Sequence, residues 1–425
     1  MTDVNEQLEP VTAPIGGSTS TPKATAGVAG QIRTQFKRLR SGDTGLVPIT
    51  VGLLVLIVYF QVRNSVFLSA SNLTNLSIQA TIYILLGMAE IWLLLLGEID
   101  LSVGYVAALG GVVGTILTDY QFHWAWYLAL PLAVLITTLI GVLNAVLVIR
   151  LRLPSFIVTL AGFLIWQGAV IYLVDHQGTG GAVPVQEKVL YDLVGGNLTP
   201  VATWLFVLLC VAGVAYLMIR GTQRRRANGL DTVPFFLTLT KIVLLVAVGI
   251  LLIVVFNANR STFVVLRGMP FAVPIDLALL AAGTFVLAKT RTGRYIYAIG
   301  GNSEAVRRAG VSVNRYRFIA FVATGFTAGI AGLLYSSRLG GISDSIDPTL
   351  TLYSIAAAVI GGTSLFGGRG KMVHAVIGGL IIAVIYNGMA LLSMSPPTVY
   401  IVTGIVLLAA VTIDSVARRG GPQLR

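Results

Sequence analysis

The hydrophobic residues of this chain are gathered in long runs that short polar segments separate. A run of ~20 apolar residues is long enough for a helix to cross the ~30 Å hydrocarbon layer of a membrane. Twelve such segments are predicted, at about residues 46–62, 75–97, 101–118, 125–149, 155–174, 202–219, 235–256, 271–288, 318–338, 351–366, 372–392 and 397–415. The pattern therefore predicts an all-α polytopic membrane protein with about twelve transmembrane helices.

The ends of the chain do not follow this pattern. Residues 1–44 are rich in Thr, Pro, Gly and Ala, carry a basic patch at 33–40 and lack the apolar stretch of a signal peptide. This composition favours a disordered cytoplasmic tail. The expected organisation is that tail, a transmembrane domain over residues 45–417 and a short cytoplasmic tail over residues 418–425.

The positions of the cationic residues test the number of spans. With the N-terminus placed inside, 24 of the 29 Lys and Arg residues fall in cytoplasmic segments or at cytoplasmic ends of spans. Cytoplasmic loops carry such an excess, and losing one span in the middle would scramble it. Both termini are therefore predicted to be cytoplasmic, and the polar segments 175–200, 257–270 and 339–349 are predicted to lie outside.

Composition excludes several other classes of protein. The chain is 56% hydrophobic and only 11% charged, which excludes an ordinary soluble domain. Its net charge of +12 does not indicate a nucleic-acid partner, because the basic residues form short clusters at the ends of apolar segments. Cys210 is the only cysteine, so no disulfide can form within the chain.

Residues 289–317 form a polar, basic stretch between two predicted spans and hold seven cationic side chains. One interpretation is an ordinary loop whose charges only set the topology. The other is a docking surface for a soluble partner at the cytoplasmic mouth of the membrane domain. The second interpretation depends on a short helix that residues 303–309 are predicted to form.

The signals for this short helix are local. Asn302 or the serine after it can cap the N-terminus, and Glu304 lies in the first turn, where the helix dipole favours an anion. Arg307 and Arg308 fall in the last turn, where the dipole favours cations. Gly310 then ends the helix as the first residue beyond it.

Four blocks of sequence stand out, namely GEIDLSVG (97–104), LPSFIVTLAG (153–162), AIGGNSEAVRRAGVSVNRYR (298–317) and AAVIGGTSLFGGRG (357–370). In type and order they resemble the motif blocks of the ribose/xylose/galactoside family of ABC sugar-importer permeases. The resemblance covers about residues 72–414 and is closest to the xylose permeases. The additional span pair at 202–256, around the basic segment 220–229, is the feature that looks xylose-type.

The resemblance implies a type II ABC importer-like permease whose stretch 289–317 contains the coupling helix. That helix docks into a separate ATPase subunit. The role is carried onto eight residues of this chain, namely Gly300, Gly301, Asn302, Glu304, Ala305, Arg307, Arg308 and Gly310.

The resemblance also implies the partners and the cargo. The permease is expected to work in the cell membrane as a homodimer, with the path at the interface, an ABC ATPase inside and an extracytoplasmic sugar-binding protein on the outer segments. The ATPase uses the ATP, so this chain itself is expected to bind no cofactor and to catalyse no reaction. The expected cargo is a monosaccharide, D-xylose first, with ribose or another sugar of the family as the alternative.

Ionisable residues in spans indicate function, since an isolated charge near the bilayer centre costs ~3 kcal/mol or more and must face protein or water. Glu90, Glu98 and Asp100 are of this kind. Glu98 and Asp100 fall at the turn between the second and third spans, where Asp100 can cap the helix that begins LSVG. Capping and gate packing are one interpretation, and direct contact with the sugar is the other. Glu90 departs from the family pattern, which has a small polar residue there.

The candidate residues of the gate or translocation path are Glu98, Asp100, Ser102, Asn144 and Asn387. The two asparagines lie within spans, where a hydrogen bond between helices is the alternative to sugar recognition.

Small residues four apart predict close packing between helices. The two pairs are Gly110 with Gly114 and Gly325 with Gly329. A moving gate is the alternative role for these positions.

Other functions find little support in the sequence. GGRGKM (367–372) ends like a phosphate-binding loop, but Leu365 replaces its first glycine and Met372 replaces the hydroxyl residue that reaches magnesium. The three histidines are scattered without the spacing of a metal site, and no catalytic arrangement suggests a membrane enzyme. The rival is a secondary transporter driven by protons or sodium, which needs several buried ionisable residues, whereas Glu90 is the one deep candidate.

Overall fold

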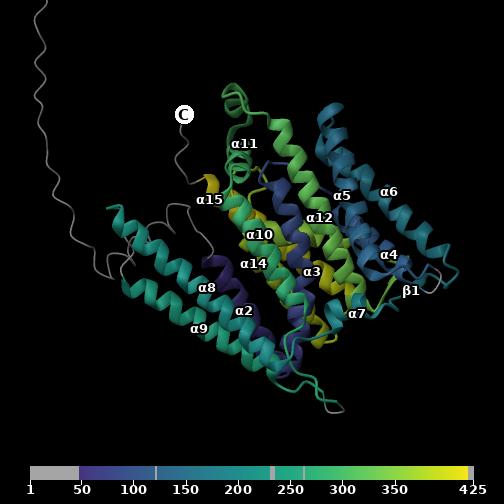
Figure 1. Ribbon diagram of the computed structural model, residues 1–425, viewed down its shortest axis with the longest axis horizontal. Helices are drawn as coiled ribbons and strands as arrows, with labels where there is room; N and C mark the ends of the chain where they lie inside the picture. Colours follow the sequence, from purple (N-terminus) through teal and green to yellow (C-terminus); the bar gives the residue numbers. More distant parts are fainter. Residues whose placement is uncertain (1–46, 120–121, 230–234, 262–263, 420–425) are drawn as a thin grey trace, which may run out of the picture. The chain divides into compact units, whose positions relative to one another are not determined.

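The computed structural model describes residues 47–119, 122–229, 235–261 and 264–419, and these are mostly helical (Figure 1). The helices are α2 (Val47–Arg63), α3 (Ala70–Leu94), α4 (Val103–Thr118), α5 (Trp126–Arg150), α6 (Ser155–Asp175), α7 (Lys188–Gly195), α8 (Pro200–Ala227), α9 (Phe235–Asn257), α10 (Ala272–Lys289), α11 (Arg291–Arg308), α12 (Val313–Leu339), α13 (Thr349–Ile360), α14 (Met372–Leu391) and α15 (Pro396–Arg419). The strands are β1 (Ala182–Pro184) and β2 (Gly341–Ser343). The predicted N-terminal tail and residues 420–425 lie outside the described residues.

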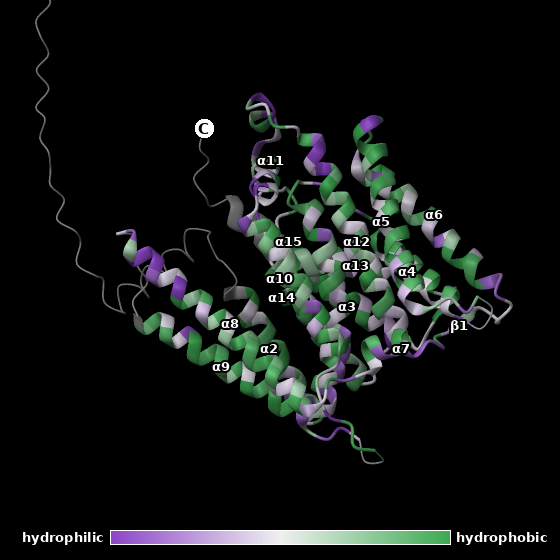
Figure 2. Ribbon diagram, viewed as in Figure 1, coloured by the Kyte–Doolittle hydropathy of each residue, from purple (hydrophilic) through white to green (hydrophobic). Residues whose placement is uncertain are grey.

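Each of the twelve predicted apolar segments coincides with one helix. Eight of these helices, α3, α5, α6, α8, α9, α10, α12 and α14, are long and apolar enough to cross a membrane. The other four, α2, α4, α13 and α15, are apolar but shorter over the residues described. Figure 2 shows hydrophobic residues along the helix bodies and hydrophilic ones along α11. The all-α, multi-pass class is therefore confirmed.

Helix α3 forms the centre of the bundle, since 89% of its most apolar window is buried. It packs against α12, α13 and α14, while α12 also packs against α4 and α5. Small residues permit this closeness, as predicted: a Cβ added at Gly110 would lie 3.3 Å from the Cα of Gly329 and 3.0 Å from Thr137. Close backbone approach thus holds α4, α5 and α12 together.

The additional pair, α8 and α9, packs mainly on itself. A small core of Val207, Ile253, Phe256 and Met269 joins the two helices to the segment that follows α9. The basic segment 220–229, expected to follow the span predicted at 202–219, is mostly helical, because α8 continues to Ala227. Arg220 donates a hydrogen bond of 2.7 Å to the Tyr216 hydroxyl one turn earlier, and the basic residues in the last turn suit the negative end of the helix dipole.

The segments predicted to lie outside meet at the end of the bundle opposite α11 (Figure 1). Strands β1 and β2 pair antiparallel, with Val183 opposite Ile342. Helix α7 is fastened to α12, because the Val194 N–H donates to Ser337 Oγ at 3.0 Å and Ser337 donates to the Tyr191 carbonyl at 2.8 Å. Polar segments that lie far apart in the sequence therefore pack together at this end of the bundle.

The predicted span at 351–366 is too long by six residues, because α13 ends at Ile360. Gly362 follows with φ +106°, a conformation that ends a helix. Gly361 is also pressed against α14, where a Cβ would lie 1.8 Å from the His374 carbonyl oxygen. Residues 361–366 therefore form a turn region and not the last part of the helix.

Candidate functional site

Helix α11 consists of two helices joined at a break. The break is Asn302, whose φ of −158° and ψ of 94° are not helical. Its side-chain oxygen accepts a hydrogen bond of 2.9 Å from the Ala305 N–H. Asn302 is therefore the N-cap of the second helix, one of the two caps predicted from the sequence.

The second helix ends at Gly310, as predicted. Gly310 has φ +80°, its N–H donates to the Arg307 carbonyl at 3.0 Å, and the Val311 N–H donates to the Val306 carbonyl at 3.2 Å. These two bonds make a Schellman motif, which requires a left-handed residue at this position. Among the residues that the structure describes, no atom lies within 4 Å of where a Cβ would be, so backbone conformation and not crowding favours glycine here.

The charged residues of this helix face solvent. Glu304 pairs with Arg307 at 3.4 Å and with Arg308 at 3.3 Å, and all three side chains are more than half exposed. Ala305 between them is exposed too. Exposed pairs of this kind contribute little to stability, so the side chains remain available to a partner.

The first helix of α11 rests directly on two loops of the membrane domain. A Cβ at Gly300 would lie 1.8 Å from the carbonyl oxygen of Leu95 and 2.4 Å from the nitrogen of Gly368. The Gly368 N–H itself donates to the Leu95 carbonyl at 2.9 Å, and Tyr297 donates its hydroxyl to the Gly370 carbonyl at 2.7 Å. The turn after α3 and the loop before α14 therefore form one seat for α11, whereas Gly301 next to Gly300 has open space around it.

Glu98 in this turn makes an ion pair with the beginning of α12. Its Oε1 accepts from Arg317 Nε at 2.8 Å, and the Glu98 side chain is only 8% exposed. Arg317 is the last residue of the stretch 289–317 and lies in the first turns of α12, so the pair links α12 to the seat of α11.

The other polar residues of the turn form a connected chain. Asp100 Oδ1 accepts from the Ser102 N–H at 2.8 Å and from its hydroxyl at 2.6 Å, and Asn144 of α5 donates to the Ser102 hydroxyl at 3.4 Å. Glu90 Oε1 accepts from the Asp100 N–H at 3.1 Å. Thr159 of α6 accepts from the next amide, that of residue 101, at 3.0 Å. The turn is therefore tied to three helices.

The predicted cap of α4 needs a correction. The N-cap is Ser102 and not Asp100, and Asp100 instead holds Ser102 from two residues before it. The chain turns at Gly97 and again at residues 101–102, so α4 begins at Val103, two residues later than predicted. Burial raises the pKa of the Asp100 carboxyl, while its two hydrogen bonds from Ser102 act to lower it.

Asn387 lies apart from these residues. It exchanges two hydrogen bonds with Asn72, of 2.9 and 3.1 Å, which join α14 to α3 near the ends opposite the α11 seat. Both amides are satisfied by this exchange.

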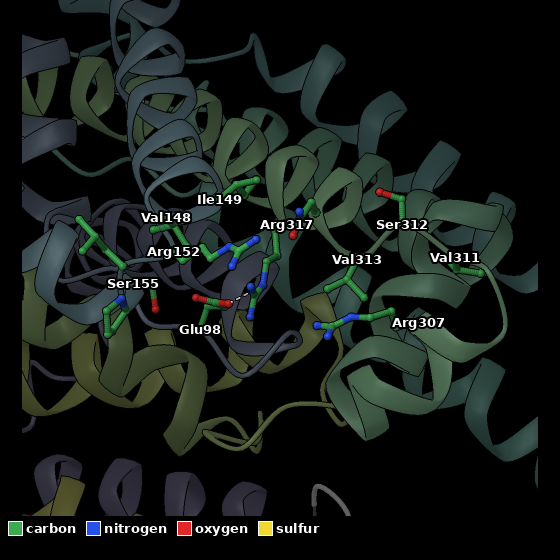
Figure 3. A pocket seen from close by; sticks show the side chains of 13 residues that line it. Glu98, Val148, Ile149, Arg152, Ser155, Arg307, Val311, Ser312, Val313 and Arg317 are labelled. Atoms are coloured by element: carbon green, nitrogen blue, oxygen red, sulfur yellow. Dashed lines mark ion pairs between the residues drawn. The ribbon is translucent and has the colours of Figure 1, made fainter.

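A cavity of about 730 Å³ opens beside the Glu98–Arg317 pair (Figure 3). It is lined by Glu98, Val148, Ile149, Arg152, Leu153, Pro154, Ser155, Arg307, Val311, Ser312, Val313, Asn314 and Arg317. Three arginines and one glutamate make its wall strongly basic. The four motif blocks singled out in the sequence thus meet around this cavity and the seat of α11.

Sequence reasoning missed Arg317 as the partner of Glu98 and Arg152 as a wall of the cavity. Arg317 is the last residue of a quoted block, but nothing in spacing relates it to a glutamate more than 200 positions earlier. For Arg152 the sequence held one local indication, because it directly precedes Leu153, the first residue of the block at 153–162. Within the described ranges no group of His, Cys, Asp and Glu side chains could hold a metal ion.

Comparison with known proteins gives a consistent result. The family described as "Branched-chain amino acid transport system / permease component" matches residues 72–223 and 232–411. The xylose transport system permease protein XylH of Escherichia coli (strain K12) is 35% identical over 396 residues, which cover 90% of this chain and 95% of that protein. XylH of Haemophilus influenzae is 34% identical over 89% of this chain and 98% of its own length. The ribose import permease protein RbsC of Haemophilus influenzae is 27% identical over 86% of this chain and 91% of its own. No solved structure matches this chain.

Proposed function

Because the chain belongs to the family of branched-chain amino acid transport system permease components, we propose that it is the membrane-spanning permease subunit of an ATP-driven ABC sugar importer. Its cargo is D-xylose. The similarity to XylH carries this conclusion, since it extends over nine tenths of both chains and is therefore a similarity of whole permease subunits. Ribose is the second candidate, supported by the weaker similarity to RbsC.

In this proposal the twelve helices that coincide with apolar segments all belong to the membrane domain, residues 45–417, and both termini are cytoplasmic. The α11 end then faces the cytoplasm, and α7 with the paired strands faces outward. The protein is a multi-pass protein of the cytoplasmic membrane and works as a homodimer, with the path at the interface.

Two further subunits complete the importer. An ABC ATPase hydrolyses ATP, so the permease itself is not an enzyme and holds no cofactor. A sugar-binding protein delivers the cargo to the outer end of the bundle.

The geometry suggests how ATPase closure is passed on. The ATPase grips the exposed helix 303–309, whose ends are fixed by Asn302 and Gly310. A displacement of this helix moves the first part of α11, which touches the backbone of both loops at Gly300. The turn after α3 carries Glu98, and through Arg317 the motion also reaches α12. The contact at Gly300 is between backbone atoms, which cannot rotate away as a side chain can, so this part of the link is stiff.

Transport by the reconstituted importer tests the function. Proteoliposomes that hold this permease with its ATPase and binding protein should accumulate labelled D-xylose when ATP is inside, and a protonophore should not stop them. Uptake of ribose in place of xylose would show that the cargo is wrong. Uptake without ATPase or ATP, sensitive to the protonophore, would overturn the importer in favour of a secondary transporter.

A further inference from the structure

The cavity beside the Glu98–Arg317 pair has no role in the function proposed above. Its wall comes mainly from the end of α5, the turn between α5 and α6, and the chain that runs from the coupling helix into α12. Helices α5 and α6 are both long and apolar enough to cross a membrane. The turn that joins two such helices, here residues 151–154, lies at the membrane surface. The cavity therefore lies at the level of the lipid headgroups.

Three arginines and one glutamate line the cavity. In Figure 3 the Arg152 and Arg307 side chains point toward Arg317 from opposite sides. Arg317 pairs with Glu98 at 2.8 Å, and Arg307 pairs at 3.4 Å with an exposed glutamate outside the wall. Arg152 makes no ion pair or hydrogen bond with any residue that the structure describes. An unpaired guanidinium beside two others is an arrangement that a bound anion stabilises.

The backbone at Arg152 is also unusual. Its φ is +55°, in the left-handed region that glycine and asparagine adopt readily and that a residue with a long side chain rarely adopts. Residues held in such conformations are concentrated at ligand and active sites, where the strain is part of the function. Here the left-handed turn holds a guanidinium in the wall of the cavity.

Two helices begin at the same cavity and add to its positive potential. Pro154 and Ser312, the N-cap residues of α6 and α12, both line it, and neither forms a side-chain cap hydrogen bond. The positive ends of the two helix dipoles therefore reinforce the field of the arginines. The volume of about 730 Å³ is that of a small-molecule site and is larger than a single carboxylate side chain fills. Guanidinium forks match the oxygens of a phosphate group, so phosphate is the anion that suits this wall.

An exposed apolar stripe begins at the cavity and follows α6. Phe156, Leu160 and Leu164 are 53%, 49% and 62% exposed. Residues four apart share one face of a helix, so the three side chains form a continuous stripe along a helix that can span the membrane. The stripe begins directly after Ser155, which lines the cavity. A ligand with a phosphate head and an acyl chain therefore finds both of the surfaces that it needs.

We propose that the cavity binds the phosphate of an anionic membrane lipid whose acyl chains lie along α6. The inference goes beyond the importer function and depends on neither the cargo nor the ATPase. Arg152 supplies the unpaired guanidinium, and the phosphate offsets the repulsion between Arg152 and Arg317. The bound lipid joins the α5–α6 turn to the start of α12, beside the coupling helix. Basic pockets between spanning helices are a known form of site for anionic lipid headgroups.

Lipid-dependent melting of the purified permease tests the proposal. Dioleoyl phosphatidylglycerol is titrated into the protein in a neutral detergent, with dioleoyl phosphatidylcholine and inorganic phosphate as comparison probes. Arg152→Gln removes the unpaired guanidinium. Arg150→Gln is the matched control, because it removes the same charge two residues earlier, at an exposed side chain that does not line the cavity.

We expect phosphatidylglycerol to raise the melting temperature of the wild type and of Arg150→Gln by roughly 2–5 °C more than phosphatidylcholine does, when its concentration is about ten times its Kd. Arg152→Gln should need roughly tenfold more phosphatidylglycerol, or more than that, for the same shift, since it loses a charge-assisted hydrogen bond. Without phosphatidylglycerol this variant should melt like the wild type, because the Arg152 side chain has no partner to lose among the described residues.

Several results would overturn the proposal. Equal shifts from the two lipids in the wild type would exclude a site for anionic lipid, and an unchanged titration of Arg152→Gln would exclude the cavity. Equal weakening in Arg150→Gln would mean that the lipid responds to the overall charge of this end. An equal shift from inorganic phosphate, lost in Arg152→Gln, would assign the cavity to a free anion, and a lower melting temperature of Arg152→Gln without lipid would make the arginine structural. Neither sugar nor ATP enters these measurements, so each result leaves the proposed importer function standing.

Discussion

The contact of α11 with its seat leads to a prediction about two adjacent glycines. A Cβ at Gly300 would lie 1.8 Å from the Leu95 carbonyl oxygen, and real Cβ atoms essentially never come closer than 3.0 Å, so Gly300→Ala requires a separation of at least 1.2 Å. The atoms in the way are backbone atoms, which cannot rotate aside. Overpacking of this kind costs about 1–3 kcal/mol, against which alanine recovers roughly 0.5–1 kcal/mol of helix propensity. Most of the strain is expected to appear as a displacement of α11.

Gly301 provides the matched control for the seat, because a Cβ there meets no atom of the described residues within 4 Å. Although Gly301 is one of the eight predicted coupling residues, Gly301→Ala should leave the contact of α11 with its seat unchanged and should therefore insert normally and lose much less stimulation than Gly300→Ala. A displacement of about 1 Å at a coupled site can change a rate by up to ~100-fold, so Gly300→Ala should lower sugar-stimulated ATPase activity and transport together by roughly five- to 100-fold. The assay compares reconstituted complexes with equal subunit content, and sugar binding to the delivery protein should not change. Normal stimulation in Gly300→Ala at normal abundance would refute the idea that backbone contact at the seat transmits the motion.

Three further predictions follow from the same end of the molecule and from the topology. Gly310→Val places a side chain at φ +80° and should cost about 1–2 kcal/mol at the helix end, while Glu304→Lys removes both exposed ion pairs. Both variants should insert normally but lose sugar-stimulated ATPase activity. Wild-type stimulation in both would mean that the stretch 289–317 is only a basic loop. Arg317→Met leaves the nearly buried Glu98 carboxylate without its partner and should lower the free energy of unfolding by about 1.5–3 kcal/mol. Arg317→Lys should lose less, because it keeps the positive charge. Equal thermal stability of the Met variant and the wild type would contradict a stabilising role for the pair. Reporter fusions at Gly229 and Gly341 should report cytoplasm and exterior respectively, and the reverse result at either position would refute the twelve-span arrangement.

The sequence by itself determined the helices and the local geometry of the coupling stretch. In a membrane each spanning segment must satisfy its own backbone hydrogen bonds, so a run of ~20 apolar residues is enough to predict a helix. The cap at Asn302 and the end at Gly310 could be predicted for a similar reason, since each depends on residues within one or two turns.

Only the tertiary structure decided which residues meet. Glu98 contacts Arg317 and Gly300 contacts Leu95 across more than 200 positions of the chain, and Gly300 contacts Gly368 across more than 60. No rule of sequence spacing predicts contacts at such separations. The sequence also did not show that α13 ends at Ile360, because Gly362, which turns the chain with φ +106°, lies between the apolar helix and the apolar pair Leu365 and Phe366.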